Sequence, residues 1–496
     1  MSIVLPRHRL SQLAALVFCA LAFGCHGEAR PPVHRGPIVL ITIDALRADV
    51  VGALGGPPKI MPALSGLARQ ADWAGRAISP SSWTVPSMAA IFTGFQPWRA
   101  RSWSSERAVL DERLVTLPEA LKAAGYRTAG FRSNHWLQAE FGYGQGFDTF
   151  RYLREGRRAE SYLAKLDGGP DFVWIHILPP HAPYVRRDAL LERLDDEIPP
   201  DLPRQVRPLD LEPYYDPAVD LPPEKERIFR AMYELNAAWA DQMLSHLLAA
   251  LKRSGQWDKT FLVVTADHGE EFGENGQIAH GGNLGHVLVE VPLVIKLPAG
   301  FRRKLDLQPG RRPANVRVGP TLIEAAGGTP EPGAAPSFFH SFEKGALSEL
   351  YLGNAVNRFS LVNGDLQLLW ESRFGAPEPE YYRARYAGIG GKPEPPLTEP
   401  VQAIFGRLER EFAGVLPLSG RRGKPPQVTL WRWTPNGTVR VNDSAQIQRM
   451  ARQLRNAWLA ANGSEVPPGR SVGRQPHLTP KQEEELRALG YVAGGN

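Results

Sequence analysis

The chain has 496 residues, of which 43% are hydrophobic and 22% are charged. These proportions are those of an ordinary globular protein, and the length suffices for one large α/β domain with an appendage or for several smaller domains. The net charge of +6 suits an anionic substrate. Because the sequence has no run of Lys and Arg and no basic-aromatic stripe, we do not expect nucleic acid as a partner.

The first 25 residues have the pattern of an export signal. Arg7 and Arg9 form a basic start, and the apolar stretch 10–23 that follows is too short to span a bilayer. The stretch leads into Cys25 in a context that resembles a bacterial lipobox, although Ala22 stands where leucine is usual. We therefore expect a lipid anchor on Cys25 and a place in the bacterial cell envelope, facing the periplasm or the exterior. Ordinary secretion and an uncleaved anchor are the alternatives.

Cys19 and Cys25 are the only cysteines, and both belong to this N-terminal segment. A mature domain without cysteine can have neither a disulfide framework nor a cysteine metal site. Residues 26–37, which are polar and contain prolines, are predicted to form a short tether between the signal and the folded part of the chain.

Two apolar stretches, Ile38–Ile43 and Phe261–Thr265, are predicted to be buried strands of a parallel sheet. Asp44 follows the first strand directly, and Asp267 and His268 lie just beyond the second. Since ligands of open α/β sheets bind beyond the carboxyl ends of the strands, these residues are candidates for one shared site. Carboxylate and imidazole groups suit a divalent metal. The alternative is that Asp267 caps a following helix and Gly269 makes the turn.

The segment Ser81–Gly94 has the pattern of a helix start. Pro86 follows hydroxyl residues and precedes good helix formers, which places a helix N-terminus near Thr84. Backbone N–H groups and the helix dipole favour an anion at such a position. A plain N-cap role is the commoner use of a hydroxyl there.

Two loop histidines are further candidates. His181 lies in a proline-rich loop after the predicted strand Phe172–Ile177, and the prolines restrict where its side chain points. His280 lies close in sequence to Asp267 and precedes the predicted strand Val291–Leu297. The alternatives are a solvated loop histidine at His181 and a loop tip at His280.

Other stretches complete the predicted organisation. Residues 127–134 are predicted to form a strand, and residues 223–253 a long amphipathic helix with apolar residues three and four apart. Past about residue 340 we expect a small α+β subdomain over residues 341–465, with an irregular insertion at 371–426. Its predicted elements are a hairpin 359–370 turning at Asn363-Gly364, a strand 427–431 and a helix 444–461. The tail 466–496 contains a short helix that starts with a capping box at Leu478–Gln482 and ends at Gly490.

Taken in order, these pieces resemble the sulfatase branch of the alkaline phosphatase superfamily. Order and spacing agree over about residues 37 to 330, and the matching pieces are Ile41–Asp49, Thr84–Ser87 with Thr93-Gly94, Pro180–Tyr184, Asp267–Glu274, His280-Gly281 and Val291–Leu293. The resemblance implies an α/β fold with a mostly parallel central sheet flanked by helices, which forms a catalytic domain over residues 38–340.

The resemblance also implies one divalent metal ion, Ca²⁺, Mg²⁺, Mn²⁺ or Zn²⁺, held by Asp44, Asp267 and His268. The oxygen of Thr84 would be a further ligand and the nucleophile toward an anionic ester substrate. His181 and His280 would contact the transferred group or protonate the leaving oxygen. Members with two zinc ions add an Asp-x-x-x-His set before the Asp-His-Gly, and its absence from this sequence favours one metal.

The sequence departs from the sulfatase pattern at the nucleophile. Sulfatases carry Cys-x-Pro-x-Arg or a serine variant, whose first residue is oxidised to formylglycine, whereas this chain has Thr84 and Met88 at those positions. Threonine cannot give formylglycine, but it is the nucleophile in phosphodiesterase, phosphatase and phosphoethanolamine-transferase branches of the superfamily. We therefore predict a metal-dependent hydrolase of phosphate or sulfate esters, with phosphate esters favoured. A sulfatase proper, a phosphoethanolamine-type transferase and an inactive binding lipoprotein are the alternatives.

Overall fold

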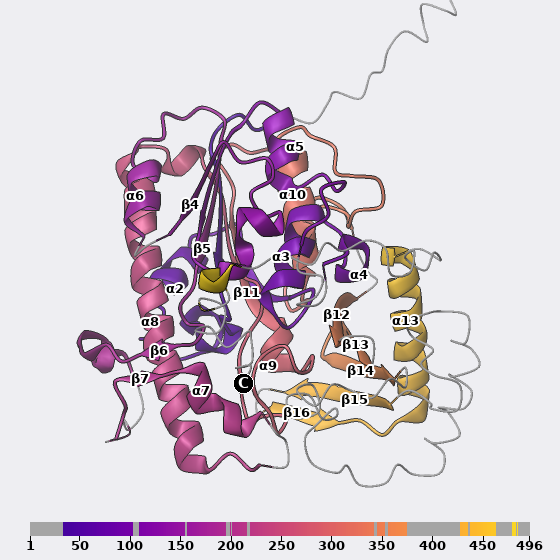
Figure 1. The fold of residues 1–496 in the computed structure, drawn as a ribbon. Coiled ribbons are helices and arrows are strands. Elements are labelled where there is room, and N and C mark those ends of the chain that lie inside the picture. The colour runs from indigo at the N-terminus through magenta and orange to yellow at the C-terminus, as the bar shows by residue number, and fades with distance from the viewer. Residues whose placement is uncertain are drawn as a thin grey trace, which may run out of the picture.

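The structure is a computed structural model that describes residues 33–482 and 484, apart from the internal ranges 103–108, 154–155, 195–198, 200, 216–218, 342–344, 353–355, 374–426, 435–436 and 463–478 (Figure 1). The predicted signal, most of the tether and the predicted helix end at Gly490 lie outside the described residues. The domain boundaries drawn there remain predictions.

A seven-stranded sheet with the order β2-β11-β8-β1-β5-β3-β4 forms the centre of the fold. Its strands are β1 (Ile38–Ile43), β2 (Trp73–Ile78), β3 (Arg127–Arg132), β4 (Thr149–Tyr152), β5 (Asp171–Ile177), β8 (Phe261–Ala266) and β11 (Glu290–Lys296). The block from β8 to β4 is parallel, and β11 runs antiparallel to both of its neighbours. Every residue of β1, β5, β8 and β11 is buried, which explains their nearly continuous apolar sequences. The predicted mostly parallel sheet is confirmed.

Helices cover both faces of this sheet (Figure 1). The long α8 lies on one face with α2 and α6, and α3, α5 and α10 lie on the other. The bounds of the helices in this part are α2 (Pro62–Ala68), α3 (Thr84–Thr93), α4 (Pro97–Ala100), α5 (Leu117–Ala123), α6 (Arg157–Leu163), α7 (Pro208–Leu211), α8 (Pro223–Arg253), α9 (His286–Val289) and α10 (Val318–Ala325). The spacing of apolar residues in 223–253 predicted one apolar face of α8. These residues are buried in the structure, apart from the half-buried Trp239.

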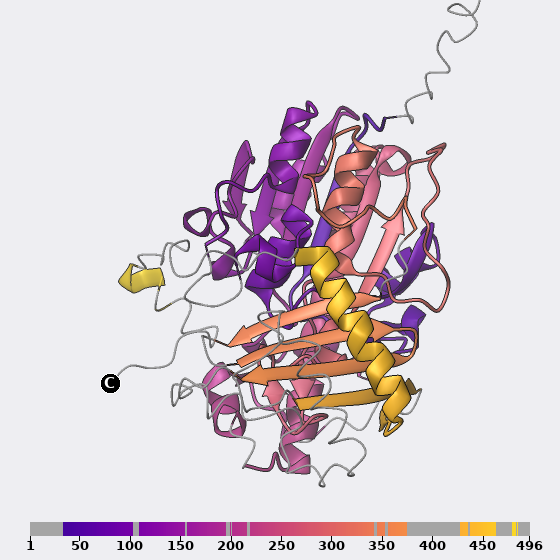
Figure 2. The same ribbon diagram turned by 90° about the vertical axis from the view of Figure 1, so that its right-hand side faces the viewer.

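A second, antiparallel sheet of five strands follows, with α13 (Ser444–Asn462) across one of its faces (Figure 2). Its strands are β12 (Ala346–Leu352), β13 (Val356–Asn363), β14 (Leu366–Arg373), β15 (Gln427–Thr434) and β16 (Gly437–Arg440). Trp370 and Trp458 are buried in the core between the sheet and the helix. The opposite face packs against the first part of the chain through apolar contacts such as those around Ile78 and Leu350. The end of β2 at Ile78 is therefore joined to the second sheet.

Several element boundaries differ from the predicted ones. β3 ends at Arg132, two residues before the predicted end at Asn134. The hairpin is present, but its strands stop at Asn363 and resume at Leu366, so that Gly364 and Asp365 form the turn, with Gly364 at φ 64°. β14 continues to Arg373, three residues into the range predicted to be irregular. The rest of that range, 374–426, lies outside the described residues.

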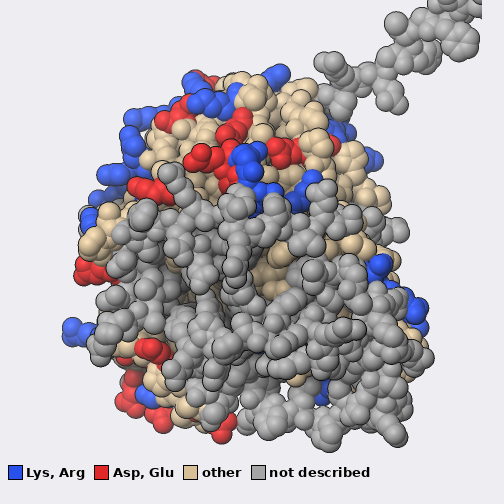
Figure 3. All heavy atoms as spheres, turned by 45° about the vertical axis from the view of Figure 1, so that its right-hand side comes forward, with Lys and Arg blue, Asp and Glu red and all other residues tan. Residues whose placement is uncertain are grey.

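The short two-stranded pairs lie in the loops, β6 (Tyr184–Val185) with β7 (Gln205–Val206) and β9 (Glu271–Phe272) with β10 (Ile278–Ala279). The predicted capping box in the tail is present, because Gln482 Oε1 accepts from the Thr479 N–H at 2.9 Å and the Gln482 N–H points back to Thr479 Oγ1 at 3.4 Å. Within the described ranges, no helix combines the length and the apolar character needed to cross a bilayer. On the face drawn in Figure 3, described basic and acidic side chains are interspersed.

Candidate active site

The sheet order places the predicted metal ligands side by side. β1 and β8 are neighbours, with Ile43 opposite Ala266, so Asp44 and the residues after β8 leave the sheet at the same edge. One side-chain atom each from Asp44, Asp267 and His268 lies within 4.8 Å of the other two, and all three residues are fully buried. The alternative that Asp267 only caps a helix is wrong, because the next element is the strand β9.

The turn after β1 ties the two carboxylates together. Ala45 has a positive φ of 56°, and its N–H donates to Asp267 Oδ1 at 3.2 Å. The Tyr233 hydroxyl donates to Ala45 O and accepts from the Arg47 N–H, both at 2.9 Å. A non-glycine residue in the left-handed region is uncommon, and here the surrounding hydrogen bonds hold it in place.

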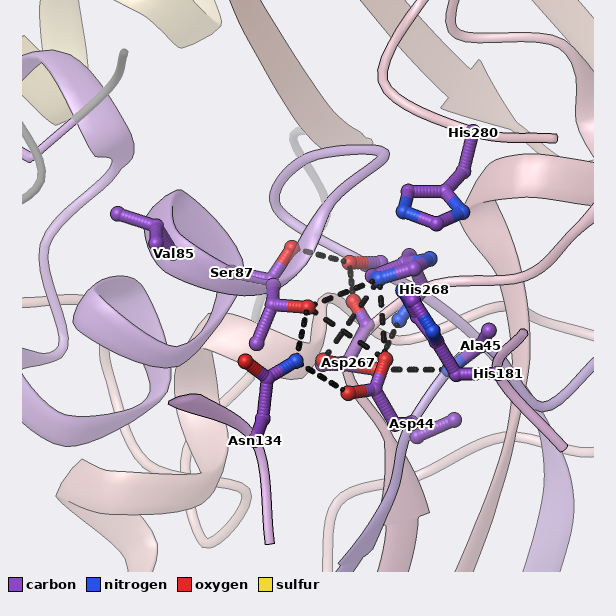
Figure 4. Close-up of polar contacts among 12 residues, drawn as sticks. Asp44, Ala45, Val85, Ser87, Asn134, His181, Asp267, His268 and His280 are labelled. Carbon is purple, nitrogen blue, oxygen red and sulfur yellow. Dashed lines mark hydrogen bonds and ion pairs between the residues drawn. The ribbon is translucent and has the colours of Figure 1, made fainter. Parts of the chain in front are cut away.

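Thr84 is the first residue of α3, and Trp83 occupies the N-cap position. The Thr84 hydroxyl oxygen therefore does not serve as the N-cap, and it lies 3.4 Å from Asp44 Oδ1 and 3.3 Å from His268 Nε2. Figure 4 shows the carboxylates of Asp44 and Asp267 between the start of α3 and the three histidines. The predicted nucleophile and the predicted metal ligands thus form one cluster.

Asn134 belongs to this cluster and was missed by the sequence analysis. Its Nδ2 donates to Asp44 Oδ2 at 2.7 Å and to the Thr84 hydroxyl oxygen at 3.3 Å. The signal was available, because Asn134 follows β3 at the same edge at which Asp44 follows β1. Reading the strand two residues too long placed this amide inside the predicted sheet.

His176 was also missed. It lies within β5 opposite Thr42, and its Nε2 is 3.8 Å from Asp44 Oδ2 and 3.7 Å from Asp267 Oδ2. Neither ring nitrogen has a hydrogen-bond partner within the described part of the chain. A histidine inside an apolar strand gives no sequence signal that separates a core residue from a site residue.

The two predicted loop histidines meet above the metal ligands. The ring centroids of His181 and His280 are 4.8 Å apart, and those of His268 and His280 are 4.5 Å apart. His181 Nδ1 lies 2.6 Å from Ala182 O, which fixes the orientation of the ring. Both residues are buried, so the alternatives of a solvated histidine and an exposed loop tip are wrong.

His280 is paired with a buried carboxylate that was not predicted. His280 Nδ1 lies 2.8 Å from Glu270 Oε1, and the Tyr184 hydroxyl donates to Glu270 Oε2 at 3.1 Å. Burial raises the pKa of Glu270 to about 7, against the opposing influence of His181 and His268. A carboxylate on one ring nitrogen fixes the tautomer and leaves the other nitrogen for the reaction.

The electrostatics of the cluster favour a cation. Burial alone would raise the pKa of Asp44, but His181 and His268 hold it well below its usual range. Burial alone would lower the pKa of His268, but Asp267 and Asp44 raise it to about 9. The buried Asp44 carboxylate therefore remains ionised and draws positive charge to itself.

The residues fit a divalent metal ion. Asp267 Oδ2 is buried and has no hydrogen-bond partner within the described residues, and such an atom is costly unless something else binds it. The donor set of two carboxylates, an imidazole and a hydroxyl is one that Mg²⁺, Mn²⁺, Ca²⁺ or Zn²⁺ accepts.

A groove of about 980 Å³ opens beside His181. Tyr152 and Trp239 give it aromatic walls, and Arg132 adds positive charge. Thr479, Lys481 and Gln482 also line it, and Gln482 Nε2 donates to Gln138 Oε1 at 3.2 Å. A groove of this size that shares His181 with the cluster can accept the alcohol part of an ester.

Comparison with known proteins identifies the family. The model of the Sulfatase family matches residues 37–162 and 157–328, which is more than half of the chain. This chain belongs to the sulfatase family. The sulfatase-family match covers the whole central sheet and the cluster of Asp44, Thr84, Asp267 and His268.

Individual relatives are distant. The low-salt glycan biosynthesis sulfotransferase Agl7 of Haloferax volcanii is 27% identical over 258 residues, which are 51% of this chain and 54% of that protein. The multifunctional alkaline phosphatase superfamily protein PehA of Trinickia caryophylli is 29% identical over 195 residues, 34% of this chain and 37% of that protein. The chain thus spans about half or less of the length of these relatives.

The solved structures agree in fold. The phosphonate monoester hydrolase SpPMH from Silicibacter pomeroyi superposes with a TM-score of 0.53 at 20% identity, over 82% of this chain and 99% of that one. At this identity the likeness supports the fold and leaves the substrate open.

Proposed function

We propose that this sulfatase-family hydrolase uses Thr84 as its nucleophile and cleaves phosphate esters in preference to sulfate esters. The observation that carries the proposal is the position of the Thr84 hydroxyl oxygen, 3.4 Å from Asp44 Oδ1 and 3.3 Å from His268 Nε2. A threonine at this place can attack directly, but it cannot be converted to formylglycine.

We infer that Asp44, Asp267 and His268, with the Thr84 oxygen, hold one divalent cation. When bound, such an ion would lower the pKa of the hydroxyl and neutralise charge on the transferred group. Asn134 donates to Asp44 and to Thr84 and so fixes both side chains relative to each other.

The chain's own groups supply the proton transfers. In the first displacement the Thr84 oxygen bonds to phosphorus, and its proton passes to Asp44 Oδ1, which accepts the hydrogen bond of the Thr84 hydroxyl. The bond to the leaving alcohol breaks, and His280, held by Glu270, donates a proton to the departing oxygen. His181 lies beside His280 and is placed to contact the transferred group.

In the second displacement a water molecule attacks the Thr84 ester. His280, now neutral, accepts a proton from that water, and the Thr84 oxygen leaves and takes its proton back from Asp44 Oδ1. A formylglycine enzyme avoids this step, because its hydrate expels sulfate by eliminating back to the aldehyde. Sulfate monoesters also offer less charge than phosphate esters to an arrangement of cation and histidines. Both considerations favour phosphate mono- or diesters.

The test compares kcat/KM for matched aryl phosphate and aryl sulfate substrates in the presence of Mg²⁺, Mn²⁺, Ca²⁺ or Zn²⁺. We expect the phosphate to be the better substrate, and Thr84→Val, which keeps the shape but removes the hydroxyl, to abolish turnover. Thr84→Ser is the matched control, since it retains a nucleophile. A clear preference for the sulfate ester would refute the proposal and favour a sulfatase proper.

Two other functions give different results in the same assay. A phosphoethanolamine-type transferase would release the alcohol faster when an acceptor alcohol is added, and the acceptor would take up the phosphoryl group. An inactive binding lipoprotein would bind no metal stoichiometrically and turn over neither ester. We disfavour the inactive form because each inferred ligand position is occupied by a suitable side chain.

A further inference from the structure

The segment that carries His280 is held by the second sheet. Arg358 on β13 donates to Gly282 O, and Gln367 on β14 donates to Leu284 O at 2.7 Å. Both carbonyls lie within four residues of His280. The backbone that carries this histidine therefore takes two hydrogen bonds from side chains more than 70 positions away in sequence.

The two donors are themselves fixed. Arg358 is 2% exposed, and its Nε donates to Glu371 Oε2 at 2.8 Å. Gln367 is 1% exposed, and its amide donates to Ser360 Oγ at 2.8 Å and accepts from Trp433 Nε1 at 3.1 Å. Buried side chains with all of these bonds have little rotational freedom, so they can set the position of a backbone segment with precision.

The same sheet also holds the segment that leads into Thr84. On β12, Ser348 Oγ donates to Ser79 O at 2.7 Å, and the Glu349 N–H donates to Pro80 O at 2.8 Å. Ser348 is fully buried. The nucleophile segment and the histidine segment are thus attached to neighbouring strands of one antiparallel sheet.

We propose that Arg358 and Gln367 are positioning residues that align His280 with the nucleophile. The two segments also touch directly, because the Gly281 N–H donates to Ser82 O at 2.9 Å. Arg358 and Gln367 do not touch the reacting atoms, and they act by keeping His280 where it can protonate the leaving alcohol. This inference rests on the proposed function, in which His280 is the proton donor.

The experiment uses the full-length protein with Arg358→Met combined with Glu371→Gln. The double substitution avoids leaving a buried carboxylate without its partner. The matched control is Arg312→Met, which removes another guanidinium that bridges the two sheets, here between Glu290 on β11 and Gly364 O in the β13–β14 turn. Thermal unfolding of each variant establishes that it is folded.

The informative readout is the dependence of kcat/KM on the leaving group. An ester with a poor leaving group, phenyl phosphate, needs proton donation, whereas 4-nitrophenyl phosphate needs it much less. We expect the double variant to lose about 100-fold in kcat/KM on phenyl phosphate and only a few-fold on 4-nitrophenyl phosphate, because kcat/KM reports the first displacement and not the shared hydrolysis of the Thr84 ester. The Arg312→Met control should leave the ratio of the two rates unchanged.

Gln367→Met should give the same pattern with a smaller loss, and Arg358→Lys, which retains one donor, should restore part of the rate. In a variant that already carries His280→Ala, the Arg358 and Glu371 substitutions should cause no further loss of rate, as expected for residues that act through one group. An equal loss on both esters, or a full further loss in the His280→Ala background, would overturn the proposal. If the wild type turns over neither ester, the result contradicts the proposed function itself as well as the positioning role.

Discussion

At the residue scale, Asp267 Oδ2 is the atom on which metal binding depends most, because it is buried without a hydrogen-bond partner in the described part of the chain. Asp267→Asn keeps the size of the side chain and an oxygen for the N–H groups of Ala45 and His268. We expect the variant to lose stoichiometric metal and activity together, and to lose the rise in melting temperature that added metal gives the wild type. Elemental analysis and thermal unfolding measure these quantities.

A matched control is available on α8. Asp241 is equally buried, but its carboxylate accepts from the Ala63 and Leu64 N–H groups at the start of α2 and takes no part in the metal cluster. Asp241→Asn should lower stability and leave the metal content intact. Full metal occupancy in Asp267→Asn would mean that the ligands are wrongly assigned.

Three of the site residues that sequence analysis found share one property. Asp44, Asp267 and His268 each follow an apolar strand, and neighbouring parallel strands deliver such residues to one edge. Asn134 obeys the same rule but was hidden by a two-residue error in a strand end. Glu270 carries no such signal, since its role depends on a contact with His280 across ten residues of loop.

At the scale of elements, strand β12 joins helices α4 and α13 through one buried carboxylate. Glu349 accepts from the Trp98 N–H at 2.9 Å, from the Tyr351 hydroxyl at 3.0 Å and from Asn462 Nδ2 at 2.7 Å. Burial raises its pKa from 4.5 to about 7, against the opposing influence of these hydrogen bonds.

This shift predicts a pH dependence of stability. Between pH 4.5 and 7 the unfolded chain releases the Glu349 proton while the folded chain retains it, so the free energy of unfolding falls as the pH rises through this window and levels off above it. The loss is about 3 kcal/mol at most. Glu349→Gln should remove this loss in the free energy of unfolding. Urea unfolding at pH 5 and at pH 8, in the presence of a metal chelator, measures it. An unchanged difference between the two pH values would contradict this reading.

The elements themselves were more predictable than their contacts. The apolar runs and the three-and-four spacing predicted five of the seven strands of the central sheet, all but β2 and β4, and also α8, because burial dictates those patterns locally. The bonds from Arg358 and Gln367 to the His280 segment were not predictable, since a buried arginine inside a hairpin strand has no periodicity that names its distant partner. Local patterns identify what is buried, and the tertiary fold decides which polar groups meet.

At the scale of the whole molecule, attachment to a membrane is proposed to depend on Cys25, which lies outside the described residues. Cys25→Ser should abolish incorporation of a labelled fatty acid into the protein in cells, because the thiol is the acceptor. Cys19→Ser is the matched control and should leave the label in place. Unchanged labelling of Cys25→Ser would exclude this cysteine as the anchor.

The family match ends at residue 328, yet the bonds to the Ser79–Pro80 and Gly282–Leu284 carbonyls come from residues 348 to 367. The residues of the candidate active-site cluster and the residues that hold their backbone segments therefore lie in different parts of the chain. A fragment that ends at residue 328 contains the cluster and lacks the donors at residues 348 to 367. Recombination between relatives would meet the same constraint. A crossover between residues 328 and 348 would exchange one partner of each of these bonds, so chimaeras joined there would need compatible backbones on both sides of the junction.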